Sequence, residues 1–464
     1  MSPLNILRTT VLSLVTGVSL AHRCDRTVTR DVAIIGGGAS GAHAAVRLRE
    51  DFNKSVIVVE KENRLGGHVA TYTDYAGKAY EYGVQSYFDV GGAVDFFARF
   101  NITVGAPERI SLTNVYADFS TGEAISDYVT PEATDRTEAL NRFLKAAEPY
   151  ESMLLPGYWE FPAPEDIPED LLLPFGEFAK KYGFEAAMPQ MFQVPGPVPD
   201  FTGALTLHVM QVFGAPMARA LTGDAPTFTP TEVDNTELYR RIETLLGDDV
   251  LYSSTITGAD RGDNGVKLTA RDAGGEEIII EADRLLIAFE PTSDAMASFD
   301  LDRAESAVFE KWESTRVFAG IVRHPSLPVN ISIVNTVPEA APDNYLAFPQ
   351  SPILARFDYM GPPSDLFRVL IVTDGDLSVD GALELAGTLE GGDIEDLVFA
   401  AFVDHGPMHL RASAEAITEG FIQDLYGLQG HRSTWYTGAG WSVQYTTILW
   451  AYNEVLFTKL LEYP

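Results

Sequence analysis

A glycine-rich turn directly after an apolar run is the feature that most constrains this chain. The run Val32–Ile35 leads into Gly36, and Gly36, Gly38 and Gly41 fit the pattern G-x-G-x-x-G. This spacing predicts a buried strand, a tight turn and a helix, with a dinucleotide pyrophosphate on the free N–H groups of the helix N-terminus. The residues expected along the phosphates are Gly36, Gly38, Ala39, Ser40 and Gly41. An ordinary strand–helix–strand unit without a nucleotide is the alternative.

A second apolar run ends in an acid at the expected distance. Ser55–Val59 reads as a buried strand, and Glu60 follows it 24 residues after Gly36. A carboxylate at this place accepts hydrogen bonds from a ribose diol and would repel the 2′-phosphate of NADP. The context therefore favours a dinucleotide without that phosphate.

The segment after the second strand resembles one found in the flavin amine oxidase superfamily. Asn63–His68 contains the pattern R-x-G-G-[RH]. In that superfamily the backbone of this stretch passes along the diphosphate and ribityl chain of FAD. The resemblance assigns to FAD the residues Lys61, Arg64, Gly66, Gly67 and His68.

Further stretches carry the same resemblance. Tyr80–Tyr87 resembles the segment beside the isoalloxazine, and Arg432–Trp441 resembles the C-terminal flavin-binding turn. Ala288–Pro291 resembles a strand end that approaches FAD, and a backbone amide near Ile256 is expected at the adenine edge. The additional cofactor residues that this implies are Gly83, Val84, Gln85, Ile256, Gly438, Ala439 and Trp441.

The chain is similar to fungal secondary-metabolite FAD-linked oxidoreductases of this superfamily and, more distantly, to bacterial polyenoic fatty acid isomerases. The resemblance implies an α/β fold, with a Rossmann-like FAD-binding domain of the glutathione-reductase type and an inserted α+β substrate domain. The expected FAD domain comprises residues 29–90, 228–297 and 431–464, and the substrate or cap domain comprises 91–227 and 298–430. A chain of 464 residues is long enough for such a pair of intertwined domains.

Periodicity gives the expected elements of the two insertions. The first is rich in proline and aromatic residues and predicts helices at Arg136–Met153, Pro174–Tyr182 and Leu205–Leu221. The second predicts an antiparallel sheet with strands near 317–322, 330–334, 353–359 and 367–372. Further helices are expected at Glu237–Leu246 and Ser413–Tyr426.

FAD implies redox chemistry, because the flavin is an electron sink that the protein positions. The resemblance implies oxidation of a hydrophobic small molecule by hydride transfer to flavin N5, with cyclisation in some relatives. The helix after Trp441 could stabilise negative charge on the reduced flavin through its N-terminal N–H groups. The sequence has no second G-x-G-x-x-G after a strand, which argues against a separate NAD(P)H domain. A redox-neutral double-bond isomerase and a binding protein without turnover remain alternatives.

Three residues are candidates for contact with the reacting groups. Tyr436 and Trp441 flank the flavin turn and could form a pocket wall, although core packing is an equal alternative. His405 could be a base oriented by Asp404, with a structural hydrogen bond as the alternative. His405 and His409 have a spacing that zinc ligands use on a helix, but Gly406-Pro407 would interrupt that helix, so no metal is expected.

Composition and the N-terminus restrict partners and location. A net charge of −33 disfavours binding to nucleic acids and anionic membranes. Residues 1–21 resemble a secretory signal peptide with a small-residue cleavage site, too short to span a bilayer. Secretion or residence in the secretory pathway is therefore expected, and sequons at Asn53, Asn101 and Asn330 are possible glycosylation sites. The oligomeric state stays open.

Cysteine usage limits how a flavin could be held. Cys24 is the one cysteine of the chain, so an internal disulfide is excluded. It lies far in sequence from the C-terminal flavin turn, where some amine oxidases attach flavin to a cysteine. The cofactor is therefore expected to be bound without a covalent link.

Overall fold

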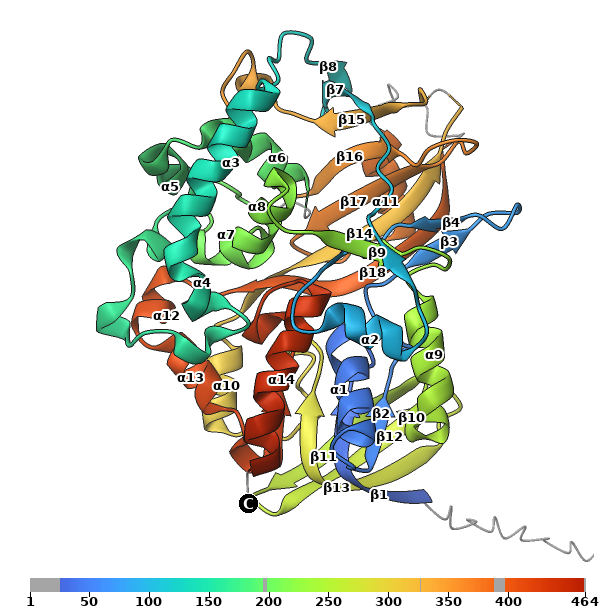
Figure 1. Cartoon of the computed structure of the whole chain (residues 1–464). Helices are drawn as coiled ribbons and strands as arrows, with labels where there is room; N and C mark the ends of the chain where they lie inside the picture. The colour runs from blue at the N-terminus through green and yellow to red at the C-terminus, as the bar shows by residue number, and fades with distance from the viewer. Residues whose placement is uncertain (1–25, 195–197, 326, 388–396, 463–464) are drawn as a thin grey trace, which may run out of the picture.

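The computed structural model describes residues 26–194, 198–325, 327–387 and 397–462. The expected signal peptide and Cys24 lie outside these residues. The described chain contains two large sheets and a group of helices (Figure 1). In the view shown, the first sheet lies in the lower half and the second sheet lies in the upper right.

The first sheet has seven strands, six of them in the order β10-β2-β1-β13-β12-β11, while β19 also pairs with β13. Its strands are β1 (Arg26–Ile35), β2 (Val56–Val59), β10 (Val250–Leu251), β11 (Ser254–Gly262), β12 (Gly265–Asp272), β13 (Glu277–Ile287) and β19 (Thr434–Tyr436). The strands β10, β2, β1, β13 and β19 run parallel. Their carboxyl ends therefore meet at one edge of the sheet, where ligands bind in folds of this kind.

Apolar runs form the centre of this sheet. Val32–Ile35 and Val56–Val59 are buried throughout, as expected for parallel strands covered on both faces. The predicted helix after the glycine turn is present as α1 (Ala39–Glu50), and it packs against α14 (Thr446–Glu462). The predicted helix at Glu237–Leu246 is confirmed as α9.

The second sheet also has seven strands, in the order β18-β14-β17-β16-β15-β7-β8. Its strands are β7 (Thr113–Asp118), β8 (Glu123–Ala124), β14 (Glu313–Arg323), β15 (Ile331–Asn335), β16 (Ile353–Tyr359), β17 (Phe367–Thr373) and β18 (Val398–Arg411). The predicted antiparallel arrangement is correct except that β15 runs parallel to β7. The exception arises because β7 comes from the first insertion and joins strands of the second, so no hairpin sets its direction.

Helices from both insertions form the third part of the molecule. They are α2 (Ala93–Arg99), α3 (Ala133–Ala147), α4 (Glu151–Leu154), α5 (Phe175–Tyr182), α6 (Met188–Gln193), α7 (Thr206–Val212), α8 (Ala215–Thr222), α10 (Arg303–Phe309), α11 (Val379–Gly387), α12 (Ala414–Thr418) and α13 (Phe421–Gly427). Small sheets pair β3 (Thr71–Thr73) with β4 (Ala79–Glu81), and β9 (Thr227–Pro230) with β5 (Tyr87–Phe88) and β6 (Val104–Gly105).

Two predicted helices are interrupted by glycine. The helix expected at Leu205–Leu221 divides into α7 and α8 at Gly214, where a Cβ atom would lie 2.6 Å from the carbonyl oxygen of Met210. The helix expected at Ser413–Tyr426 divides at Gly420, which has a φ of 96°. Gly420 has a positive φ and Gly214 is extended (φ −102°, ψ −169°), so neither residue continues a right-handed helix and the longer predictions were wrong at these points.

The two sheets draw their strands from separated parts of the chain. The first uses residues 26–35, 56–59, 250–287 and 434–436, and the second uses 113–124 and 313–411. The limits of the two predicted domains stay a prediction. None of the helices in the described ranges is long and apolar enough to cross a membrane.

Candidate cofactor site

The glycine turn lies at the carboxyl end of β1 and has the predicted conformation. Gly36 has a φ of 101°, and a Cβ atom there would lie 2.8 Å from the carbonyl oxygen of Ala288. A Cβ atom at Gly41 would lie 1.9 Å from the carbonyl oxygen of Gly36. These two glycines are therefore needed for the turn and for close packing of α1 on the strand.

Gly38 differs from its neighbours, because the fold itself leaves room for a side chain there. The nearest atom to a Cβ atom built on Gly38 is the Cα atom of Gly67, at 3.7 Å. That distance is an ordinary van der Waals contact. The open space at Gly38 therefore fits a group that the protein does not supply, as the pyrophosphate of a dinucleotide would be.

The segment Arg64–His68 lies against this turn. Gly66 donates its N–H to the carbonyl oxygen of Gly37 at 2.9 Å, and a Cβ atom at Gly67 would lie 2.9 Å from the Cα atom of Gly38. The guanidinium of Arg64 donates to backbone carbonyl oxygens of its own loop, including Gly67 at 3.1 Å. Arg64 thus shapes the loop whose backbone faces the open space.

Glu60 lies at the carboxyl end of β2 and is buried. Its two carboxylate oxygens accept hydrogen bonds from the backbone N–H groups of Gly37 at 2.6 Å and Glu62 at 2.7 Å. Burial raises the pKa of Glu60, and these N–H groups oppose that effect. The carboxylate therefore sits beside the glycine turn, where the ribose of a dinucleotide is expected. The next residue, Lys61, is exposed.

The C-terminal turn is connected to the first helix by side-chain hydrogen bonds. Thr437 donates its hydroxyl to Asn453 Oδ1 at 2.6 Å, and Asn453 Nδ2 donates to the carbonyl oxygen of Ser40 at 2.9 Å. Trp450 Nε1 donates to the carbonyl oxygen of Ala39 at 3.1 Å. Segments about 400 residues apart therefore form one wall of the site.

Glu290 is a site residue that the sequence analysis did not single out. It follows β13, is half-buried, and has a pKa raised to about 7 by desolvation, an effect that the backbone N–H groups of Ala439 and Gly440 oppose. Its Oε2 atom has no hydrogen-bond partner among the described residues. The sequence indicated only that Ala288–Pro291 approaches the cofactor, because nothing local distinguishes this acid from a surface glutamate.

The strand β18 contacts both the loop Arg64–His68 and the C-terminal turn. His68 Nε2 lies 3.0 Å from the carbonyl oxygen of His405, and the two rings are 4.6 Å apart. Burial lowers the pKa of both histidines, which keeps them neutral at physiological pH. The expected pairing of Asp404 with His405 is wrong, because Asp404 contacts Arg316. Successive side chains of a strand point to opposite faces.

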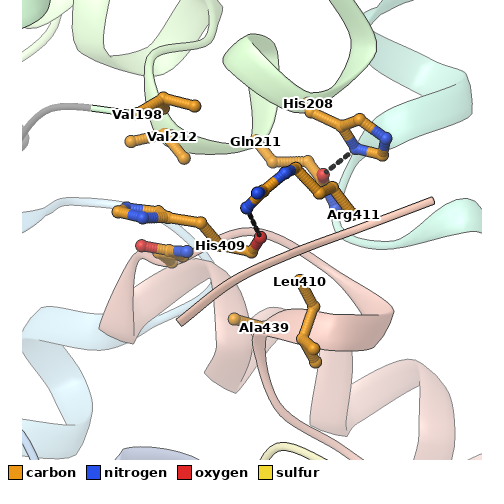
Figure 2. A pocket seen from close by; sticks show the side chains of 9 residues that line it. Val198, His208, Gln211, Val212, His409, Leu410, Arg411 and Ala439 are labelled. Carbon is orange, nitrogen blue, oxygen red and sulfur yellow. Dashed lines mark hydrogen bonds between the residues drawn. The ribbon is translucent and has the colours of Figure 1, made fainter. Parts of the chain in front are cut away.

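Further along β18, polar side chains line a narrow cavity beside Ala439 (Figure 2). His208 Nδ1 lies 3.0 Å from Gln211 Oε1, and His409 Nδ1 lies 2.9 Å from the hydroxyl of Thr315. Burial lowers the pKa of His409 to about 3. The cavity lining consists of Val198, His208, Gln211, Val212, His409, Leu410, Arg411, Ala439 and Gln444. Because His405 and His409 lie on a strand, they cannot act as the helical zinc pair considered above.

Tyr436 and Trp441 are sealed inside the protein. Both side chains are 0% exposed, and their rings stack at 4.7 Å. The hydroxyl of Tyr436 donates to Glu305 Oε1 at 2.9 Å. Neither residue belongs to the lining of the cavity in Figure 2. Their assignment to the reacting groups stays a prediction, and their surroundings are those of core side chains.

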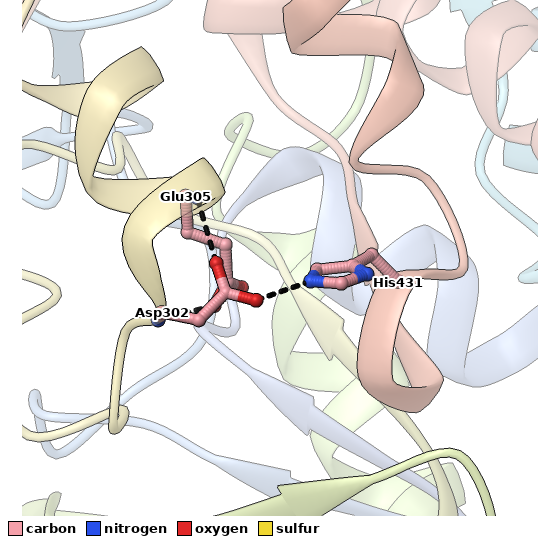
Figure 3. A group of neighbouring side chains, drawn as sticks. All are labelled: Asp302, Glu305 and His431. Carbon is pink, nitrogen blue, oxygen red and sulfur yellow. Dashed lines mark hydrogen bonds and ion pairs between the residues drawn. The ribbon is translucent and has the colours of Figure 1, made fainter.

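Three potential metal ligands lie together, and one of them, Glu305, contacts Tyr436 (Figure 3). Asp302 caps α10 through the N–H groups of Ala304 and Glu305, and its Oδ2 lies 2.6 Å from His431 Nε2. Glu305 binds the guanidinium of Arg261 with both oxygens, at 2.7 and 2.8 Å. Glu305 already pairs with Arg261, and Asp302 already bonds to His431 and to the start of α10, so we still expect no metal at this cluster.

The remaining residues that the resemblance assigned lie around the same sheet edge. A Cβ atom at Gly83 would lie 2.1 Å from the carbonyl oxygen of His68, and Val84 accepts a hydrogen bond from Asn235 at 2.8 Å. Gln85 is exposed. Ile256 is buried on β11, whose first residue, Ser254, donates its N–H to the carbonyl oxygen of Glu60 at 2.9 Å. Ile256 is therefore on the Glu60 side of the site.

Comparisons with known proteins agree with this geometry. Residues 34–100 match the NAD(P)-binding Rossmann-like domain family. Among curated proteins, β-cyclopiazonate dehydrogenase of Aspergillus oryzae is 32% identical over 461 residues, covering 97% of each chain. The FAD-dependent oxidoreductase pigF of Monascus ruber is 33% identical over 431 residues, covering 89% of this chain and 88% of that protein.

Solved structures share the fold at lower sequence identity. The CLA-producing fatty acid isomerase from P. acnes has a TM-score of 0.72 at 18% identity, covering 93% of this chain and 98% of that one. Cyclohexylamine oxidase from Brevibacterium oxydans has a TM-score of 0.60 at 14% identity, covering 93% and 99%. These likenesses support the predicted amine-oxidase-like fold.

Proposed function

Because the chain belongs to the family of fungal FAD-dependent oxidoreductases that includes β-cyclopiazonate dehydrogenase, we propose that it oxidises a hydrophobic small molecule bound against β18. The chain is an FAD-dependent oxidoreductase of secondary-metabolite type. The narrow cavity beside Ala439, between this strand and the C-terminal turn, has room for about one water molecule, so we propose it as the inner end of the substrate site and not as the whole of it.

The residues at the sheet edge fit FAD. Glu60 at the end of β2 suits the adenosine ribose, and the open space between Gly38 and Gly67 suits the pyrophosphate. The C-terminal turn at Gly438 closes the other end of the site. Bound FAD supplies the electron acceptor for oxidation, while the protein supplies binding, orientation and electrostatics.

The cavity lining favours a substrate with an apolar body and a polar oxygen. Val198, Val212 and Leu410 provide apolar surface, while Gln211 and Arg411 provide hydrogen-bond donors. His405 does not line this cavity, but it lies on the same strand, and we propose it as the group that accepts a proton from the substrate, because burial lowers its pKa and keeps the imidazole neutral. Its backbone contact with His68 places it next to the cofactor loop.

Anaerobic mixing of the FAD-loaded protein with β-cyclopiazonate, the substrate class named for a relative, tests the function. We expect lasting bleaching of the flavin absorbance, because oxidation leaves the electrons on the cofactor until an acceptor is added. A polyunsaturated fatty acid serves as the second probe. Transient bleaching with full return of colour would instead indicate isomerisation, and no bleaching with a panel of apolar amines, polyenes and indoles would argue against turnover.

We further propose that the protein enters the secretory pathway, from the signal-peptide pattern of residues 1–21. The sequon asparagines Asn53, Asn101 and Asn330 are all exposed at turns with positive φ, where a glycan would meet no packed neighbour. In a fungal host, the mature protein is expected to lack residues 1–21 and to lose mass on endoglycosidase treatment. An intact N-terminus found by mass spectrometry of the purified protein would contradict the proposal.

A further inference from the structure

The order of the parallel strands fixes the direction in which FAD crosses the sheet edge. The strands β2, β1 and β13 are neighbours in that order, and β19 pairs with the far side of β13. Glu60 follows β2, the glycine turn follows β1, and Glu290 follows β13. A dinucleotide with its ribose at Glu60 and its pyrophosphate at Gly38 must therefore extend its remaining part over the end of β13.

Glu290 meets that part of the ligand with an unsatisfied acceptor. Glu290 is half-buried, but its Oε2 atom is enclosed between the end of β13 and the turn Gly438–Gly440. A Cβ atom at Gly440 would lie 3.3 Å from Glu290 Oε2, the oxygen without a hydrogen-bond partner among the described residues. A buried acceptor without a partner is unfavourable, more so when it is charged, so a donor from outside the protein would stabilise this oxygen.

We propose that Glu290 is a cofactor-binding residue that accepts a hydrogen bond from a hydroxyl group of the FAD ribityl chain. The ribityl chain directly follows the pyrophosphate and carries hydroxyl donors, whereas phosphate oxygens are acceptors that a carboxylate would repel. The inference rests on the proposed use of FAD and assigns to this site a polar contact that neither glycine motif supplies.

The geometry also explains why the carboxylate is tolerated in this place. The backbone N–H groups of Ala439 and Gly440 stabilise its charged form, while burial opposes it. Pro291 and Leu410, which lie around the same turn, contribute only apolar surface. The backbone N–H groups thus offset part of the cost of burying the charged carboxyl, and a hydrogen bond from a ligand hydroxyl would offset more of it.

Titration of the apoprotein with FAD and with FAD analogues that each lack one ribityl hydroxyl tests the proposal. Wild type, Glu290→Gln and Glu290→Leu are compared at a pH well above 7 by quenching of flavin fluorescence. We expect FAD affinity to fall about tenfold in Glu290→Leu, and less in Glu290→Gln, which keeps an acceptor oxygen. The analogue that lacks the hydroxyl bound by Glu290 should bind wild type about tenfold more weakly than FAD does. The same analogue and FAD should bind Glu290→Leu with equal affinity, because that variant has no acceptor to lose.

Controls separate this contact from folding and from the proposed function. Glu281→Gln changes an exposed acid of the same strand and should leave FAD affinity unchanged. Thermal melting of the apoproteins should show Glu290→Leu at least as stable as wild type, since the unpaired carboxyl is removed. This inference would be overturned if wild type and Glu290→Leu bound FAD with equal affinity. It would also be overturned if every deoxy analogue lost the same affinity in both proteins. Neither result would contradict the proposed function. A wild-type protein that binds no FAD would overturn the proposed function as well.

Discussion

Gly38→Val is expected to abolish FAD binding while the protein stays folded. Gly38 has ordinary backbone angles, and a Cβ atom there makes only a 3.7 Å contact with Gly67. The branched side chain would fill the open space that the pyrophosphate needs, without disturbing the strand or the helix. By contrast, a side chain at Gly41 would collide with Gly36 and damage the fold itself.

FAD titration of the apoprotein and thermal melting of the same preparations check this expectation. Gly262→Val is the matched control, because a Cβ atom there has no neighbour within 4 Å and the position is away from the turn. Glu60→Gln should only weaken FAD binding, at a cost on the order of 1 kcal/mol, since one hydrogen bond to the ribose can persist. Wild-type affinity in Gly38→Val would show that this turn does not hold the cofactor.

Trp441→Ala should lower the free energy of unfolding by about 3–5 kcal/mol, the usual cost of removing a buried aromatic side chain. The indole is fully buried and stacks at 4.7 Å on Tyr436, whose hydroxyl is held by Glu305. Its loss would leave a cavity next to the buried Arg261–Glu305 pair and would loosen the flavin turn only indirectly.

Denaturant unfolding and stopped-flow flavin reduction on one preparation distinguish packing from a direct role. We expect Trp441→Phe to recover much of the stability, because it refills part of the space. We also expect Trp441→Ala to reduce its flavin near the wild-type rate at a temperature where it is folded. A variant that unfolds like wild type but reduces its flavin far more slowly would place Trp441 at the reacting groups instead.

The three glycines of the motif have separate roles, and the tertiary structure gives the packing reason for them. A side chain at Gly36 would meet Ala288, and one at Gly41 would meet Gly36, so the backbone itself requires both glycines. Gly38 has open space beside Gly67, so its predicted role toward the pyrophosphate depends on the ligand. Ala288 and Gly67 come from other parts of the chain, and their positions follow from the tertiary structure.

The sequence by itself determined the cofactor-binding core. The apolar runs at Val32–Ile35 and Val56–Val59, the glycine spacing and Glu60 are local features, and local backbone geometry follows from neighbouring residues. The turn, α1 and the strand ends therefore appear where the sequence predicts them. The sequence also indicates the resemblance to fungal FAD-linked oxidoreductases, because short local motifs carry that resemblance.

The tertiary structure alone decided which distant groups face the cofactor site. Glu290 lies against Gly440, and His68 lies on His405, through tertiary contacts that join residues more than 100 positions apart. The tertiary structure also buries Tyr436 and Trp441 in the core and brings Asp404 into contact with Arg316. No local pattern encodes these outcomes, because burial and contact of a side chain depend on the order of strands in a sheet.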